Sequence, residues 1–201
     1  MLSPQGDSDV FLVKYDADGN HLWSRSVGQS ASVRINDLQA DADGTIVAVG
    51  FFDGTIALDG VSLESAGGSD VLVMSFDPLG NLRWASNFGN FNDQVARRAS
   101  IDESGNILVT GHFTGSIDFG RAPLQTAGGE DGFIVKLDAD GTALWSRALA
   151  GPSDGHRAED VAVAPDGAVV VTGWTSGEAT FGDEAIDTAD GLDIFMARLA
   201  P

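Results

Sequence analysis

The sequence contains no cysteine among its 201 residues, few basic residues and no long apolar run. The lack of cysteine excludes disulfide scaffolds, thiolate metal sites and cysteine nucleophiles. Lysine and arginine number 11 against 30 acidic residues, and the resulting formal charge of −19 makes nucleic acid and anionic membrane surfaces unfavourable partners. No apolar run approaches the roughly 18 residues that span a bilayer, so we expect no membrane insertion.

Hydrophobic residues make up 43% of the chain, which is enough for a packed core in one domain or a short repeat array. The opening stretch, MLSPQGDSDV, lacks the basic and apolar segments of a secretory signal. Because the chain enters a repeat almost at once, we expect a further segment to precede it in a longer parent protein.

A repeat of about 61 residues runs through the chain, since LWSRSVG returns as RWASNFG and as LWSRALAG. The tryptophans in these stretches, at Trp23, Trp84 and Trp145, are evenly spaced. Fixed spacing over a length of this kind is typical of stacked supersecondary units. Because each tryptophan can bury roughly 150–250 Å² of surface, we predict that the three pack one unit against the next.

Each unit has the pattern of β structure, because short runs rich in β-branched and aromatic residues are bounded by Asp and Gly. One unit is predicted to have strands at 34–41, 45–52, 71–76 and 82–88, with a small extra hairpin within 53–70. In VFLVKY, beginning at Val10, apolar residues occupy both faces, which predicts a strand covered on both sides by stacked sheets. No window has sustained helical periodicity, so no helix of consequence is expected.

A repeated four-stranded antiparallel unit of this size predicts a β-propeller blade. We take the whole chain, 1–201, as one all-β repeat array with units at about 7–66, 67–127, 128–188 and a partial unit at 189–201. Thirteen strands make about three and a third blades, fewer than the roughly four to eight of closed propellers.

We therefore expect an incomplete ring, because an open array exposes strand edges and apolar faces. Either the chain is a fragment of a longer propeller or it forms a homo-oligomer. In a dimer, IFMARL of one copy would sit beside HLWSRSV of the other and complete a shared blade, giving about six blades.

The stretch GSIDFGRAPLQTAGGEDGFIVKLDADGTALW, at 115–145, resembles the bacterial β-propeller repeats named SBBP. The matching pieces are VTG, DFG, AGG, the D-x-F-x-x-K-x-D pattern and G-x-x-L-W. The resemblance implies a propeller fold and an extracellular or cell-surface parent protein. It implies no catalytic residues, because the family is defined by its structural repeat.

The D-x-x-G turns, of which DADGN at 16–20 is the first, have two interpretations. Several acidic oxygens would suit calcium, but counting a twelve-residue loop from Asp16 puts Val27 where a bidentate acid is needed. Across the units only the Asp and the Gly persist, as in DPLGN, and these are the residues that a hairpin turn needs. The sequence favours the turn, with calcium as the alternative and no other cofactor expected.

Two further motifs carry little support for chemistry. GPSDG, at 151–155, matches the G-x-S-x-G pattern of a nucleophile elbow and precedes His156, but no helical pattern follows it. His112 falls where other units have Phe51 and Trp174, so we predict that it packs in an aromatic slot. Zinc has no second ligand at a suitable spacing.

The loops that join one unit to the next vary most and are predicted to share one face with the loops after each second strand. Variable loops on a rigid frame are where binding specificity usually lies. The candidate partner-binding residues are Phe91, Asn92, Asp93, Arg97, Arg98, Asp154, His156 and Arg157.

The function favoured by the sequence is a non-enzymatic interaction scaffold that binds a protein or a glycan. The alternatives are a lectin-like propeller with one carbohydrate site per repeat and part of a larger propeller hydrolase or lyase. The lectin alternative requires polar and aromatic loop residues that stay constant between units, and here they vary.

Overall fold

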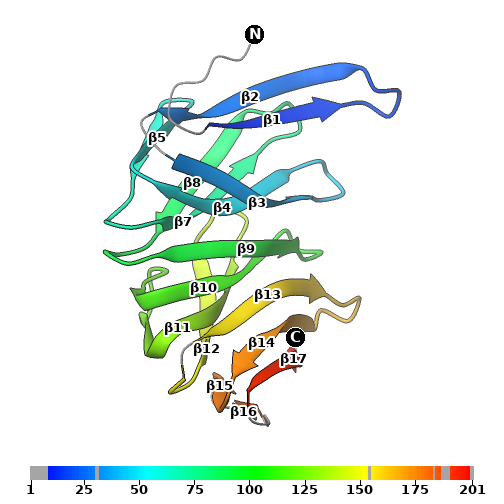
Figure 1. Cartoon of the computed structure of the whole chain (residues 1–201). Coiled ribbons are helices and arrows are strands. Elements are labelled where there is room, and N and C mark those ends of the chain that lie inside the picture. Colours follow the sequence, from blue (N-terminus) through cyan, green and yellow to red (C-terminus); the bar gives the residue numbers. More distant parts are fainter. Residues whose placement is uncertain (1–8, 30–31, 154, 183, 187–190, 200–201) are drawn as a thin grey trace.

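Alternating apolar residues arrange the chain into four stacked antiparallel sheets (Figure 1). The computed structural model describes residues 9–29, 32–153, 155–182, 184–186 and 191–199. Those residues form seventeen strands and, within these ranges, no helix. In Figure 1 the stack runs from β1 and β2 at one end to β14 and β17 at the other.

Each sheet is named by its order along the chain. The first has the order β1-β2-β5-β6: Val10–Tyr15, His21–Gln29, Thr55–Leu58 and Val61–Glu64. The second has the order β3-β4-β7-β8: Ser32–Ala40, Ile46–Asp53, Asp70–Phe76 and Leu82–Phe88. The third has β9-β10-β11-β12-β15-β16: Gln94–Ile101, Ile107–Ile117, Leu124–Leu137, Ala143–Ala150, Ala179–Phe181 and Glu184–Ile186. The fourth has β13-β14-β17: His156–Val163, Val169–Ser176 and Leu192–Leu199.

The predicted all-β propeller fold is confirmed, with a ring that the described residues do not close. Of the seventeen strands, β5, β6, β15 and β16 form extra hairpins, which leaves the thirteen main strands that the repeat predicted. The four strands of the second sheet match their predicted ranges to within two residues at each end. The predicted hairpin within 53–70 is β5 and β6.

Both extra hairpins join the sheet that precedes their own unit. Strand β5 pairs with β2 through Gly28 and Ala57, and β15 pairs with β12 through Leu149 and Phe181. In the middle unit the equivalent segment is continuous with β10 and β11, and its Phe119 ring lies 5.0 Å from the ring of Phe88 in β8. Neighbouring sheets are therefore tied together at their outer sides as well as packed face to face.

The core consists of three layers, each between two neighbouring sheets. The strand β4 contributes Ile46 and Ala48 to the layer shared with the first sheet, and Val47 and Val49 to the layer shared with the third. A third layer, which includes Phe195, joins the third and fourth sheets. This two-sided burial is the reason why the middle strands are apolar on both faces.

The repeated tryptophans lock one sheet to the next, as predicted. The indole Nε1 of Trp84 donates to the Ala139 carbonyl at 2.9 Å, and its ring covers Gly141 in the D-x-x-G turn between β11 and β12 of the third sheet. Trp23, in the first sheet, makes the same contact with the D-x-x-G turn of the second sheet, donating to the Pro78 carbonyl at 3.2 Å. The turn glycine is needed twice over, because it has a positive φ and because a side chain there would meet the indole.

The end sheets differ from the prediction that every such strand is covered on both sides. In β1, Phe11 is 68% exposed and Tyr15 is 58% exposed. In β17, Ile194 is 88% exposed and Met196 is 76% exposed. The prediction was wrong for β1 because a strand in an end sheet has a neighbouring sheet on one side alone within the described residues.

The predicted shared blade is also wrong for this arrangement. Strand β1 pairs along β2 from His21 to Val27, and β5 pairs with Gly28 at the end of β2. The place beside HLWSRSV that IFMARL of another copy would take in a shared blade is therefore already filled by β1 of the same chain.

Candidate functional site

A β-bulge recurs at one position in three sheets, on the strand that begins each of these units. The register between first and second strands skips one residue in β3, β9 and β13, namely Asn36, Arg97 and Glu159. A bulge leaves its extra residue out of the pairing and re-aims the side chain. The residue at the bulge therefore differs in chemistry from unit to unit, being an amide, a cation or an anion, although it occupies the same position in the repeat.

A glycine in the second strand makes room for each bulge. A Cβ on Gly50, Gly111 or Gly173 would lie 1.9, 2.0 and 1.9 Å from the carbonyl oxygen of the residue two before the bulged one. Real Cβ atoms do not approach a carbonyl so closely, so no other residue fits without moving the first strand. The repeated glycine at the end of TIVAVG, NILVTG and AVVVTG is explained by this contact.

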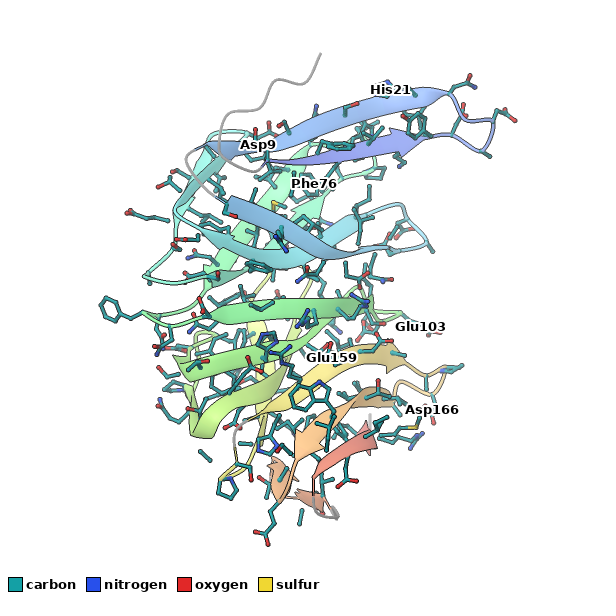
Figure 2. All side chains as sticks on the ribbon, in the orientation of Figure 1. Asp9, His21, Phe76, Glu103, Glu159 and Asp166 are labelled. Carbon is teal, nitrogen blue, oxygen red and sulfur yellow. The ribbon has the colours of Figure 1, made fainter. Side chains whose placement is uncertain are left out.

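The bulged residues join the first strands of neighbouring sheets. The Asn36 Nδ2 donates to the Ala96 carbonyl at 2.7 Å, and Arg98 Nη1 donates to the Asn36 carbonyl at 3.1 Å. One sheet further along, Arg97 Nε lies 3.8 Å from Glu159 Oε2. Figure 2 labels Glu159 on β13, the first strand of the fourth sheet, which contacts β9, the first strand of the third.

A charged and aromatic group lies between the third and fourth sheets, and we call it the junction cluster. Its members are Arg97, His112, Glu130, Arg157, Glu159 and Trp174. Arg157 binds the Glu130 carboxylate with two nitrogens, Nε to Oε1 at 2.5 Å and Nη2 to Oε2 at 3.1 Å. Two-pronged pairs of this kind are strong and fix direction. Both side chains are about a quarter exposed, so the pair lies at the surface of the junction.

Trp174 connects this pair to the bulged residues. The Arg157 guanidinium lies 5.4 Å from the centre of the Trp174 ring, a cation–π distance. The indole Nε1 donates to Glu159 Oε1 at 3.3 Å, and Glu159 also faces Arg97. Two cations, two anions and a partly buried indole are thus held by strands of two sheets.

His112 forms the buried floor of the junction cluster. It is 6% exposed, and its Nε2 lies 3.5 Å from Glu130 Oε2, while Nδ1 has no hydrogen-bond partner among the described residues. Burial, and then the charges of Arg157 and Arg97, lower the pKa of His112 to about 3, against an opposing effect of Asp93. The ring is therefore neutral at pH 7. Its predicted burial in the slot of Phe51 and Trp174 is confirmed, and its polar neighbours are new.

This neutral histidine predicts a loss of stability in acid. Because the folded pKa of about 3 lies below the ordinary 6.5, the unfolded chain binds the proton better, and stability falls as the pH drops below about 6.5. At pH 5 the loss from His112 is about 2 kcal/mol. Urea denaturation measures the effect. Between pH 7 and pH 5 the free energy of unfolding of the wild type should fall by about 2 kcal/mol more than that of His112→Phe.

Burial raises the pKa of Asp70 and of Asp131, and these groups also contribute to the pH dependence of stability. Because the wild type and His112→Phe share them, the difference between the two proteins removes their contributions. His21→Gln, on the exposed hairpin between β1 and β2, is the control and should keep the wild-type pH dependence. A His112→Phe variant that keeps it as well would contradict this account.

The loop that follows β8 carries three of the predicted binding residues. Its backbone is fixed: the Phe91 carbonyl accepts from Gly68 N at 3.2 Å, and Asp93 Oδ1 accepts from Ser69 N at 2.9 Å. Gly67 and Gly68 of the AGG stretch allow this approach, since a Cβ on Gly67 would lie 2.5 Å from the Phe91 Cα. Phe91 is nevertheless 88% exposed, and Asn92 and Asp93 are exposed too.

The other predicted residues, which lie outside this loop, have different surroundings. Arg97 and Arg157 belong to the junction cluster, and Asp93 acts on the same histidine from the neighbouring loop. Arg98 is exposed and lies between the first strands. Asp154 lies outside the described residues.

His156 is fully buried and makes no accessible binding residue. The Thr175 hydroxyl donates to the Gly177 carbonyl at 3.0 Å, so His156 Nδ1 donates to Thr175 Oγ1 at 2.6 Å. Its Nε2 then faces Asp131 Oδ1 at 3.9 Å. Burial raises the pKa of Asp131, and backbone hydrogen bonds from Ala127 and Gly151 oppose this. The GPSDG stretch that precedes His156 joins two strands, β12 and β13, as the sequence predicted.

The sequence did not identify Glu130, Glu159 or Trp174 as site residues. Glu130 is replaced by Ser69 one unit earlier, and Glu159 by Arg97, so no repeat signal selects them. The detectable signal was the glycine opposite each bulge. It predicts that the residue at the bulge is unpaired and variable.

The D-x-x-G turns use their aspartates for the backbone, as the hairpin interpretation predicted. Asp16 Oδ1 accepts from the backbone nitrogens of Asp18 at 3.0 Å and Asn20 at 2.8 Å, and its Oδ2 accepts from the Asn20 amide at 2.9 Å. The Asn20 side chain is the main cause of a lowered pKa of Asp16. Among the described residues, no group of three or more His, Asp or Glu side chains is placed to hold a metal ion.

Comparison with curated proteins gives two distant relatives. The chain is 26% identical to an uncharacterized WD repeat-containing protein of Acanthamoeba polyphaga mimivirus, over 82% of this chain and 14% of that protein. It is 25% identical to the regulatory protein FlaEY of Caulobacter vibrioides, over 84% of this chain and 18% of that protein. No family model matches the chain.

These relatives agree with the fold and leave the family open. WD repeats form propeller blades of four strands, which is the architecture described above. The chain spans less than a fifth of the length of either relative. No helix in the described part of the chain is long and apolar enough to cross a membrane.

Proposed function

We propose that the chain is a non-enzymatic interaction module of a β-propeller scaffold built from SBBP-type repeats. The resemblance of the repeat supports a secreted or surface protein of a bacterium as its parent. The similarity to a WD repeat-containing protein and to a regulatory protein supports a role in binding other proteins. The binding face is the one that carries the Phe91 loop and the junction cluster.

The observation that carries this proposal is an exposed aromatic side chain on a fixed backbone. Phe91 is 88% exposed, although the loop that holds it is bound to the 65–70 loop by backbone and side-chain hydrogen bonds. An aromatic anchor held this way loses little entropy on binding, which is typical of interface hot spots.

The neighbouring charges indicate the partner. The side chains of Glu130 and Glu159 are both partly exposed, and each is paired with an arginine, so they offer hydrogen-bond acceptors without adding net charge. The chain as a whole carries −19. A protein with an apolar pocket for Phe91 and a basic rim fits this surface best.

Site-specific photocrosslinking tests the proposal. A photoreactive phenylalanine analogue at position 91 should capture a protein from an extract of the source cells, and the same analogue at Leu79 should not. Leu79 is the matched control because it is 72% exposed and lies in a D-x-x-G turn at the other end of the strands.

With the captured protein purified, we expect Phe91→Ala to weaken binding about 10- to 100-fold, the range of a hot-spot truncation, and Leu79→Ala to leave it unchanged. Equal capture from both positions, or an affinity that ignores Phe91, would contradict the proposal. A glycan array and a hydrolase panel on the same protein test the lectin and hydrolase alternatives, and a hit that depends on the junction cluster would favour one of them.

A further inference from the structure

We propose that the two end sheets bind each other between copies, so that two chains associate head to tail and close a ring of eight sheets. The proposal is independent of the Phe91 face and of any partner that binds there. It starts from the apolar side chains that the first and fourth sheets expose.

The exposed positions are those that form the core layers elsewhere. In β7, Leu72, Met74 and Phe76 pack toward the first sheet, whereas Val71 and Val73 pack toward the third. All five are 0% exposed. The strand therefore has one face for the preceding sheet and one for the following sheet.

The two end strands each expose one of these faces, and they expose opposite ones. Phe11 and Tyr15 of β1 occupy the repeat positions of Leu72 and Phe76, which face a preceding sheet. Ile194 and Met196 of β17 occupy the positions of Val71 and Val73, which face a following sheet. We name the first the leading face and the second the trailing face.

The faces are complementary, because a leading face packs on a trailing face at every internal junction. The same kind of contact joins the first sheet to the second, the second to the third and the third to the fourth. The end faces carry apolar residues, with Phe11 68% and Ile194 88% exposed. A strand with one face in solvent usually has polar residues on that face, in alternation with apolar residues on the buried face.

A second copy is the occupant that satisfies both faces at once. Each chain has one leading and one trailing face, so two chains make two equal junctions and leave neither face exposed. A contact of this head-to-tail type closes into a ring when the rotation allows it. Two copies of four sheets give eight, within the roughly four to eight blades of known propellers.

The junction between copies lacks one feature of the internal ones. A tryptophan covers the turn glycine of the next sheet at Gly80 and Gly141, whereas nothing lies within 4 Å of the Cβ position of Gly19. The fourth sheet consists of β13, β14 and β17 and supplies no strand of the tryptophan type among the described residues. We therefore expect a reversible dimer that dilution separates, unlike the junctions within the chain.

Sedimentation equilibrium of the purified full chain tests the proposal. The wild type should have twice the 20.8 kDa mass of the chain at high concentration. Phe11→Asp and Ile194→Asp should each weaken association by about a hundredfold or more, because either one damages both junctions of the dimer. Leu79→Asp, at an exposed apolar residue away from both faces, should leave the mass unchanged.

Mixing the two variants distinguishes a head-to-tail contact from a symmetric one. In a mixed pair, the Ile194→Asp chain still has its leading face and the Phe11→Asp chain its trailing face, so one intact junction should restore a dimer. Because each chain carries a charge of −19, added salt should tighten association.

Three results would overturn the proposal. The first is a wild-type monomer at all concentrations, which would assign the end faces to further repeats of a longer polypeptide. The second is a dimer broken by one of the two substitutions and not by the other. The third is a ladder of larger species with no dimer plateau. Far-ultraviolet circular dichroism checks that every variant keeps its β structure.

Discussion

Replacing Gly111 by alanine should lower the free energy of unfolding by about 3–4 kcal/mol, more than most single substitutions. The added Cβ would lie 2.0 Å from the Val95 carbonyl oxygen and 2.8 Å from the Phe133 ring. The first obstacle is backbone and the second is fully buried core, so neither can move without loss of packing. Urea denaturation at pH 7 measures the effect.

Gly120→Ala is the matched control for this substitution. Gly120 has a φ of +87° and open space around its Cβ position. Alanine there bears the cost of a left-handed backbone, about 1–2 kcal/mol, without a collision. If Gly111→Ala costs no more than Gly120→Ala, the bulge does not depend on the glycine.

Replacing Trp84 by alanine should lower the free energy of unfolding by about 3 kcal/mol, the lower end of the range for core aromatic truncations, because the indole is partly buried. The indole packs on the core layer between the second and third sheets, covers Gly141 and donates to the Ala139 carbonyl. Alanine removes all three contacts at a junction in the middle of the stack. Thermal or urea unfolding, followed by the remaining tryptophans, measures the loss.

Two further variants separate packing from the hydrogen bond. Trp84→Phe keeps most of the ring packing and loses the hydrogen bond to Ala139, so it should cost about 1–2 kcal/mol. Arg83→Ala, at the exposed neighbouring position of β8, should stay within about 0.5 kcal/mol of the wild type. A Trp84→Ala variant as stable as Arg83→Ala would show that the tryptophan does not join the sheets.

The sequence predicted those parts of the fold that a repeat makes visible. The ranges of β3, β4, β7 and β8, the hairpin of β5 and β6, and the role of Trp84 each follow from a pattern that recurs from unit to unit. Residues that recur in every unit are those that the fold requires, whereas the others belong to one unit alone. The same comparison favoured a hairpin turn over a calcium loop for DADGN.

The partners of these elements were harder to predict, because they depend on contacts between units. The hairpin was placed correctly within its unit, but its pairing with β2 of the preceding sheet has no local signal. The uncovered faces of β1 and β17 could not be inferred from apolar strands that look like their buried equivalents. His156, expected in a binding loop, is buried because β13 already begins at this residue.

The junction cluster was the least predictable part. Its members come from β9, β10, β11, β13 and β14, and all except Arg157, which corresponds to Arg34, differ from their counterparts in the other units. Comparison of the repeats identifies residues that stay the same from unit to unit, so it cannot identify site residues that vary. The glycines opposite the bulges are the exception, since they mark where the variable side chains stand.

The pairing of the extra hairpins with the preceding sheet has a consequence for how the array changes length. The first sheet takes β5 and β6, and the third takes β15 and β16, from the unit that follows, so two of the three junctions between sheets cannot be separated by a single cut through the sequence. A duplicated window of one repeat length, wherever it starts, adds one complete set of strands, one tryptophan lock and one hairpin link. The array should therefore tolerate a duplicated segment that starts at any point in the repeat, provided that its length is a whole number of repeats. Gain or loss of whole units leaves every junction well formed, whereas an insertion of half a unit would leave a tryptophan without its turn.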